Sequence, residues 1–360
     1  MAQLYGKQMS KAEILRRVGD ITQVAGVRRF ALREGREEGV EAAELYTGTG
    51  FRFTVLIGRG LDISSADYRG MALAWRSSTG DTHPAYYEPE GLAWLRSFFG
   101  GLVATCGLTT AGAPSTDQGQ ALGLHGRIGN TPAHAVWADG EWRGDDYWFW
   151  VQGKMRESIV FGENLVLTRR IEAKLGESRL WIHDRVENLG HEASPLMVLY
   201  HINGGYPAVA DDGKLLSASI EVRPRDEEAE KGKEEYAQFQ APTPGYKEKV
   251  YYHEIVPDAS GCITTALANE ELGFGFYVRY RKDQLPRFTE WKMMGEGTYV
   301  VGMEPGNCLV EGRAKERERG TLQYIQPGEV REFDLEIGVL DSVEAIRSLA
   351  EELNALRRQA

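Results

Sequence analysis

Hydrophobic and polar residues alternate in short segments through most of the chain, which is the two-residue period of β-strands. In the segment 165–173, for example, Leu167, Arg169 and Ile171 fall on one predicted face. Similar segments, rich in β-branched and aromatic residues, lie at 52–57, 147–151, 180–186, 197–201, 274–280 and 333–339. Gly, Asn, Asp and Pro separate them, and strands do not alternate with helices as in a doubly wound sheet. Short strands spaced roughly 8–12 residues apart predict a mainly β fold, either a large sandwich or a barrel.

Helical periodicity is clear only at the two ends of the chain. Ser10 and Glu13 form a capping-box pattern, and Gly19 suits a helix end, so a short helix is predicted at about 10–19. A second helix is predicted at about 342–358, where Asp341 or Ser342 can cap the first turn. The apolar stripe of this helix comprises Val343, Ile346, Leu349, Leu353 and Leu356.

The most polar stretch of the chain runs from 223 to 249, and it contains Pro242, Pro244 and Gly245 near its end. Such a stretch is either a linker between domains or a long excursion from one domain. We favour the excursion, which makes residues 1–360 a single domain. Because long ordered loops often shape binding sites, this stretch is a candidate lid.

Charge and cysteine content narrow the class of partner. The 53 acidic and 42 basic residues give a net charge of −11, and the basic residues are interleaved with acids. We therefore expect no nucleic-acid partner and no membrane partner. The three cysteines, Cys106, Cys262 and Cys308, are too far apart to suggest a disulfide framework or a zinc site. The N-terminus has no apolar signal region and no stretch of about 18 apolar residues occurs, so we predict a cytoplasmic protein.

Three residues lie in local sequence contexts that favour acid–base chemistry. His125 lies between glycines in the segment 123–127, which allows a close backbone approach to a ligand. His201 ends an apolar run, and Glu304 lies in another, where burial would raise its pKa toward that of a general base. Each residue taken alone is also compatible with a structural histidine or an edge carboxylate.

The local sequences of these segments, and their order along the chain, resemble those of the aldose 1-epimerase (galactose mutarotase) superfamily. The segments 124–126, 201–203 and 303–305 are similar to those that carry its two active-site histidines and its catalytic glutamate. The turn 326–329 and the strand after it resemble the end of that fold. The segments 59–63, 99–102, 105–108 and 123–127 resemble a subfamily of uncharacterised epimerase-like proteins. The resemblance covers nearly the whole chain and implies a large antiparallel β-sandwich with short terminal helices.

The resemblance also implies a reaction and its participants. Glu304 would take the proton from the anomeric hydroxyl, and His201 would protonate the ring oxygen. His125 would stabilise the charge that develops on the sugar. The partner would be a small-molecule sugar or sugar derivative, and the reaction needs no cofactor. Six further residues are predicted to contact substrate: Arg59, Asp62, Arg127, Asn203, Trp291 and His83.

Other interpretations remain open at this level. Arg59 and Asp62 are equally consistent with a structural ion pair, Trp291 with core packing, and His83 with loop structure. The enzyme could be an epimerase or isomerase that acts at another carbon, or the protein could bind carbohydrate without catalysis. A metal enzyme using Glu304 with His83, His125, His201 or His253 is disfavoured, because no HExxH or H-x-H spacing occurs.

Overall fold

The computed structural model describes residues 1–359 and contains three large antiparallel sheets. The five-stranded sheet consists of β3 (Gly26–Ala31), β4 (Glu41–Tyr46), β5 (Phe51–Leu56), β6 (Asp62–Tyr68) and β7 (Met71–Ala72), in that order. The eight-stranded sheet has the order β11 (His134–Arg143), β12 (Asp146–Ser158), β13 (Asn164–Lys174), β14 (Arg179–Asn188), β25 (Val330–Leu340), β21 (Phe274–Arg281), β20 (Cys262–Asn269) and β17 (Lys214–Ser217). The six-stranded sheet has the order β18 (Ser219–Pro224), β19 (Lys249–Ile255), β22 (Arg287–Met294), β23 (Tyr299–Gly306), β16 (Met197–Gly204) and β8 (Ala104–Leu108).

Short elements complete the structure. Three small pairs are β1 (Ala2–Leu4) with β2 (Lys7–Met9), β9 (Ser115–Asp117) with β10 (Gln120–Leu122), and β15 (Ser194–Pro195) with β24 (Tyr324–Ile325). The α-helices are α1 (Lys11–Leu15), α2 (Glu227–Glu230), α3 (Arg313–Glu318) and α4 (Val343–Gln359). The 3-10 helices are η1 (Ile21–Gln23), η2 (Gly35–Glu37), η3 (Pro84–Tyr86), η4 (Ala93–Ser97), η5 (Ile128–Asn130) and η6 (Lys233–Glu235).

The alternating patterns do form strands, and all seven predicted segments lie in or overlap one. The predicted terminal helices are also present. The Ser10–Glu13 capping box is formed, but α1 ends at Leu15, earlier than predicted. The second predicted helix is α4, whose Ile346 and Leu353 are buried against the body of the protein.

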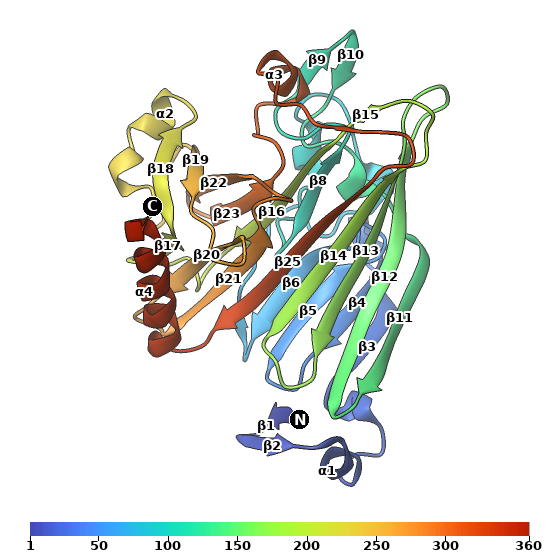
Figure 1. Cartoon of the computed structure of the whole chain (residues 1–360), viewed down its shortest axis with the longest axis vertical. Helices are drawn as coiled ribbons and strands as arrows, with labels where there is room; N and C mark the ends of the chain where they lie inside the picture. Colours follow the sequence, from blue (N-terminus) through green and yellow to red (C-terminus); the bar gives the residue numbers. More distant parts are fainter. Residues whose placement is uncertain (360) are drawn as a thin grey trace.

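One apolar core joins the three sheets. Figure 1 shows the blue strands β3–β6 behind β11–β14, with the six-stranded sheet next to β20 and β21. Phe53 of β5, Leu167 of β13 and Met303 of β23 belong to a single buried cluster. This layered packing of antiparallel sheets buries the inward face of each strand, as expected for a β-sandwich.

Strands β16 and β23 lie in the interior of the six-stranded sheet, and every residue of both is buried. On one face, Met303 Sδ accepts a hydrogen bond from Thr265 Oγ1 of β20 at 3.5 Å. Successive side chains of a strand point to opposite faces, so Glu304 points away from this core. In the register of the pair Ile202 opposes Met303, which places His201 across from Glu304.

Candidate active site

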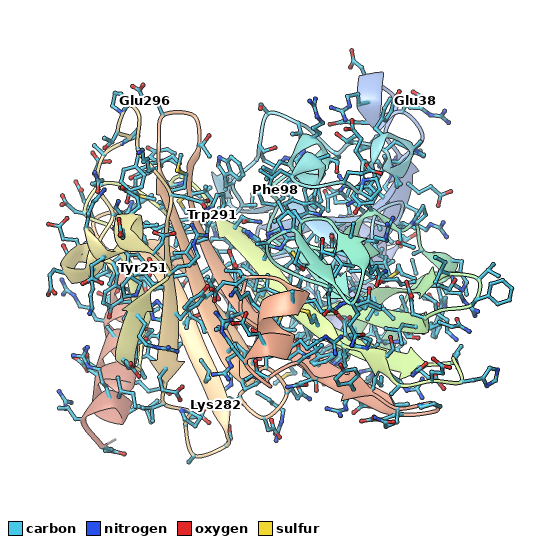
Figure 2. The ribbon with its side chains drawn as sticks, turned by 90° about the horizontal axis from the view of Figure 1, so that it is seen from above. Glu38, Phe98, Tyr251, Lys282, Trp291 and Glu296 are labelled. Atoms are coloured by element: carbon cyan, nitrogen blue, oxygen red, sulfur yellow. The ribbon has the colours of Figure 1, made fainter. Side chains whose placement is uncertain are left out.

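A cavity of about 320 Å³ lies on the outer face of the six-stranded sheet, between β16, β19, β22 and β23 on one side and η4 on the other. Trp291 of β22 and Phe98 after η4 face each other there, with ring centroids 6.3 Å apart (Figure 2). This volume is within the range of small-molecule sites. Its lining includes His125, His201 and Glu304, the three residues predicted to carry acid–base chemistry.

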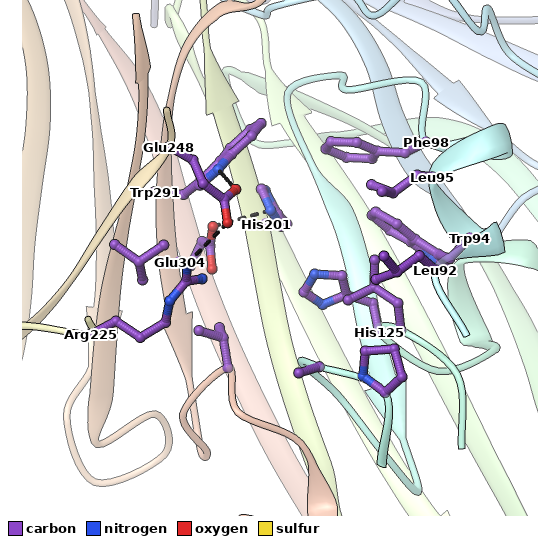
Figure 3. A pocket seen from close by; sticks show the side chains of 15 residues that line it. Leu92, Trp94, Leu95, Phe98, His125, His201, Arg225, Glu248, Trp291 and Glu304 are labelled. Carbon is purple, nitrogen blue, oxygen red and sulfur yellow. Dashed lines mark hydrogen bonds and ion pairs between the residues drawn. The ribbon is translucent and has the colours of Figure 1, made fainter. Parts of the chain in front are cut away.

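Glu304 and His201 form the polar centre of the cavity. The Nε2 atom of His201 lies 3.1 Å from Oε1 of Glu304, and both side chains are almost fully buried (Figure 3). Burial disfavours charge, so it raises the pKa of Glu304 well above its ordinary value, and nearby Glu248 adds to the increase. Burial also lowers the pKa of His201 to about 4.

Aromatic rings hold the imidazole of His201 in place. The rings of Phe98 and Trp291 lie 5.2 and 5.3 Å from it, measured between centroids. Gly302 leaves room for the pair, because a Cβ atom there would come within 2.8 Å of Oε1 of Glu304. The apolar contacts therefore keep water away from the carboxyl–imidazole pair and fix its geometry.

His125 reaches the cavity from a strained loop. Its backbone has a φ of +57°, and the next residue, Gly126, has a φ of +74°. The His125 ring packs on Trp94 at 4.7 Å and lies 5.6 Å from the ring of His201. The backbone N–H of Gly112 donates to Nδ1 of His125 at 3.4 Å, so the ring proton of the neutral form belongs on Nε2. Burial lowers the pKa of His125 well below its ordinary value, so it is a neutral hydrogen-bond donor.

Gly126 should be intolerant of a side chain. A Cβ atom there would lie 2.4 Å from the carbonyl oxygens of both Gly107 and Thr110. We expect Gly126→Ala to lower the free energy of unfolding by roughly 2–4 kcal/mol, through overpacking and the left-handed backbone. Gly119→Ala is the matched control, because Gly119 also has a positive φ of +82° but no atom within 4 Å of the added carbon. Urea unfolding measures both losses, and equal losses would contradict this account of the loop.

Two charged residues at the cavity were not among the predicted site residues. Arg225 Nη2 lies 3.0 Å from Oε1 of Glu248, and Oε2 of Glu248 accepts a hydrogen bond from the indole N–H of Trp291 at 2.8 Å. Both residues belong to the polar stretch 223–249, which connects β18 to β19 and carries α2 and η6. That stretch therefore contributes to the site at its two ends, and its polarity was the only sequence signal for them.

Arg59 and Asp62 lie beneath the site and do not line the cavity. The guanidinium of Arg59 donates to the carbonyl of Ser97 at 2.9 Å and to Asn130 Oδ1 at 2.7 Å. Asp62 is paired with Arg169 at 3.0 Å. Both predicted ligands of sugar hydroxyls thus have buried protein partners, and these partners differ from the mutual ion pair considered above.

The other predicted contacts are divided between the cavity and its surroundings. Trp291 lines the cavity. Asn203 is fully buried and donates to the carbonyls of Gly100, Gly101 and His201, so it ties a loop to β16. Arg127 is exposed outside the cavity, and His83 caps η3 by accepting from the backbone N–H of Ala85 at 3.1 Å. The structure therefore brings neither Arg127 nor His83 to the cavity.

Within residues 1–359, no group of three or more His, Cys, Asp or Glu side chains is arranged to hold a metal ion. No helix in the same range is long and apolar enough to cross a membrane.

Comparison with known structures defines the class of protein, a galactose mutarotase-like fold. A candidate aldose 1-epimerase from Klebsiella pneumoniae has a TM-score of 0.88 at 24% identity, with 92% of this chain and 87% of that chain covered. A galactose mutarotase-like protein from Clostridium acetobutylicum has a TM-score of 0.60 at 11% identity, with coverage of 89% and 99%. Galactose 1-epimerase from Lactobacillus acidophilus has a TM-score of 0.56 at 12% identity, with coverage of 88% and 99%. The predicted fold class is confirmed, and so is the predicted resemblance to galactose mutarotase-like proteins, as a likeness of fold.

The family of the chain follows from its sequence. Residues 37–339 match the family described as Domain of unknown function (DUF4432), and the chain belongs to that family. No curated protein sequence matches the chain.

Proposed function

We propose that this protein is an aldose 1-epimerase, which interconverts the anomers of a free sugar by acid–base ring opening. The contact of 3.1 Å between His201 Nε2 and Glu304 Oε1, inside a cavity of about 320 Å³, carries the proposal. The likeness to solved structures named as epimerases supports it through the fold alone.

The two groups supply what ring opening requires. The carboxylate of Glu304 takes the proton from the anomeric hydroxyl while the imidazolium of His201 gives a proton to the ring oxygen. The C1–O5 bond breaks and leaves an open-chain aldehyde. Rotation about C1–C2 and the reverse proton transfers close the ring as the other anomer. The Nε2–H of His125 donates to a sugar oxygen and stabilises the charge that develops on it.

Glu304 and His201 share a single proton throughout the catalytic cycle. With the pKa of Glu304 raised and that of His201 lowered, the free cavity favours the uncharged pair of carboxylic acid and imidazole. Transfer of that proton across the contact gives the carboxylate and imidazolium that start the reaction. After ring opening the pair is uncharged again, so the resting and intermediate states carry the same protons. The two groups titrate together, and their apparent pKa values belong to the pair.

The pH profile should show this shared proton. Below about pH 4 both groups are protonated, and no carboxylate can accept the anomeric proton. We therefore expect kcat/KM to fall as pH decreases through about 4 and to be higher above that value, where the raised pKa of Glu304 lets the pair hold one shared proton. Anomer exchange measured by NMR from pH 3 to 8, corrected for the spontaneous rate, gives the profile. An acid limb near 6.5, the ordinary value for histidine, would contradict the shared-proton assignment.

The activity itself is tested with a panel of free sugars. Exchange between anomers is followed by NMR or polarimetry with purified protein, and Glu332→Gln is the control because that glutamate is exposed on β25. We expect accelerated exchange for at least one aldose with the native protein and with Glu332→Gln. Unaccelerated exchange for every neutral aldose would remove the proposed activity.

A further inference from the structure

The cavity is divided into a polar wall and an apolar wall. The polar wall carries Arg225, Glu248, His201 and Glu304 and belongs to the six-stranded sheet and its ends. The opposite wall is formed around η4 by Leu92, Trp94, Leu95 and Phe98 (Figure 3). Among these four residues the indole N–H of Trp94 is the one polar side-chain group, and the imidazole of His125 lies beside this wall, with its ring centroid 4.7 Å from that of Trp94.

The apolar wall penalises hydroxyl groups that face it. A hydroxyl taken from water without a new hydrogen bond loses its hydration and gains nothing in return. A methyl or methylene group in the same position favours binding, because its apolar surface leaves water. Leu92 and Leu95 are 61% and 49% exposed, so a ligand whose apolar edge lies against them covers surface that otherwise faces water.

The charges of the cavity disfavour an anionic ligand. Arg225 is the only lysine or arginine among the lining residues, and it already pairs with Glu248 at 3.0 Å and Asp226 at 2.8 Å. A sugar phosphate or uronate would find no free cation there and would approach the carboxylate of Glu248. The electrostatics therefore favour a ligand without charge.

We propose that the natural substrate is a neutral deoxy sugar, an aldose in which one hydroxyl is replaced by hydrogen. Its hydroxylated edge lies against the acid–base pair and the Arg225–Glu248 pair, and its deoxygenated edge lies against Leu92, Leu95 and Phe98. This assignment rests on the proposed function for its reaction, although the choice of ligand follows from the walls alone.

Matched sugar pairs test the assignment. The pairs are galactose with 6-deoxygalactose, mannose with 6-deoxymannose, and glucose with 2-deoxyglucose. Two anionic sugars, glucose 6-phosphate and glucuronate, are tested beside them. We expect kcat/KM for the preferred deoxy sugar to exceed that of its hydroxylated partner about tenfold or more, the range of single-group discrimination in apolar pockets. Saturation-transfer NMR measures binding of the same sugars independently of turnover.

A polar substitution in the wall should reverse the preference. Leu95→Asn keeps a similar size and adds an amide that can bind a hydroxyl, so the ratio within a pair should fall severalfold toward one. Leu272→Asn is the control, because Leu272 is an exposed leucine (51%) that does not line the cavity. Circular dichroism confirms that both variants are folded.

The outcomes separate the two proposals. Equal kcat/KM and equal binding within every pair would overturn the deoxy-sugar assignment while leaving the epimerase activity in place. Tighter binding of the anionic sugars would also overturn it. Preferential binding of a deoxy sugar that Leu95→Asn abolishes, without any anomer exchange, would support the assignment and refute the proposed reaction.

Discussion

Replacing Glu304 with glutamine is expected to reduce anomer exchange by roughly 10²–10⁴-fold, the contribution of a positioned acid–base group. Glutamine has nearly the same shape, but it can neither accept the anomeric proton nor share a proton with His201. Anomer exchange measured by NMR at pH 7 gives the loss, with Glu332→Gln as the control that should keep native activity. A folded Glu304→Gln protein with native exchange rates would exclude Glu304 as the base.

The same substitution should stabilise the fold. A carboxyl whose pKa is raised on folding contributes most stability below its unfolded pKa and loses it as pH rises toward the folded value. Each unit of that elevation is worth about 1.4 kcal/mol at high pH. Because glutamine does not titrate, Glu304→Gln should match the native protein near pH 4 and exceed it by a growing margin as pH rises above the unfolded value of 4.5. Urea unfolding across this range measures the difference, and a pH-independent difference would contradict the burial of an ionisable pair.

The largest loss of stability is expected from Arg169→Met. Arg169 is completely buried on β13, and its guanidinium lies 3.0 Å from Asp62 Oδ1 and 2.6 Å from Asp184 Oδ2. The hydroxyl of Tyr200, next to His201, also donates to Asp184 at 2.6 Å. Removing the cation leaves two buried carboxylates without compensation, which costs about 3–5 kcal/mol in measured cases. Urea unfolding, or failure to obtain folded protein, shows the effect.

Two comparisons identify the cause of that loss. Arg29→Met breaks an exposed pair with Glu41, where Nη2 and Oε2 are 2.8 Å apart, and should cost about 1 kcal/mol or less. The triple variant Arg169→Met, Asp62→Asn, Asp184→Asn removes both uncompensated charges and should recover part of the lost stability. A triple variant less stable than Arg169→Met alone would show that packing of the arginine, and not its charge, supports this region.

The strands and the terminal helices could be predicted because they depend on local patterns. Alternation of side chains along β13 placed Leu167, Arg169 and Ile171 on one face, and all three are buried. The capping box at Ser10 depends on residues three apart and was formed as predicted. The early end of α1 at Leu15 shows the limit, since a helix of one or two turns depends on what it packs against.

Only some of the site residues could be predicted correctly, because the site is assembled from distant parts of the chain. His125, His201 and Glu304 could be chosen from their local segments, and they do line one cavity. Arg59 and Asp62 looked equally suitable, yet Asp62 pairs with Arg169, 107 residues away. No local pattern shows which long-range partner satisfies a charged side chain.

The amino-acid sequence alone determined where strands form, which face of each is apolar, and that imidazole and carboxyl groups stand at strand positions suited to acid–base chemistry. Only the tertiary structure decided that His201 and Glu304 come within 3.1 Å, that Arg225 and Glu248 enter from the ends of a long excursion, and that an apolar wall faces them. The physical reason is that alternation and capping depend on neighbours along the chain. Desolvation and pairing depend instead on the register between strands and on which sheets pack together.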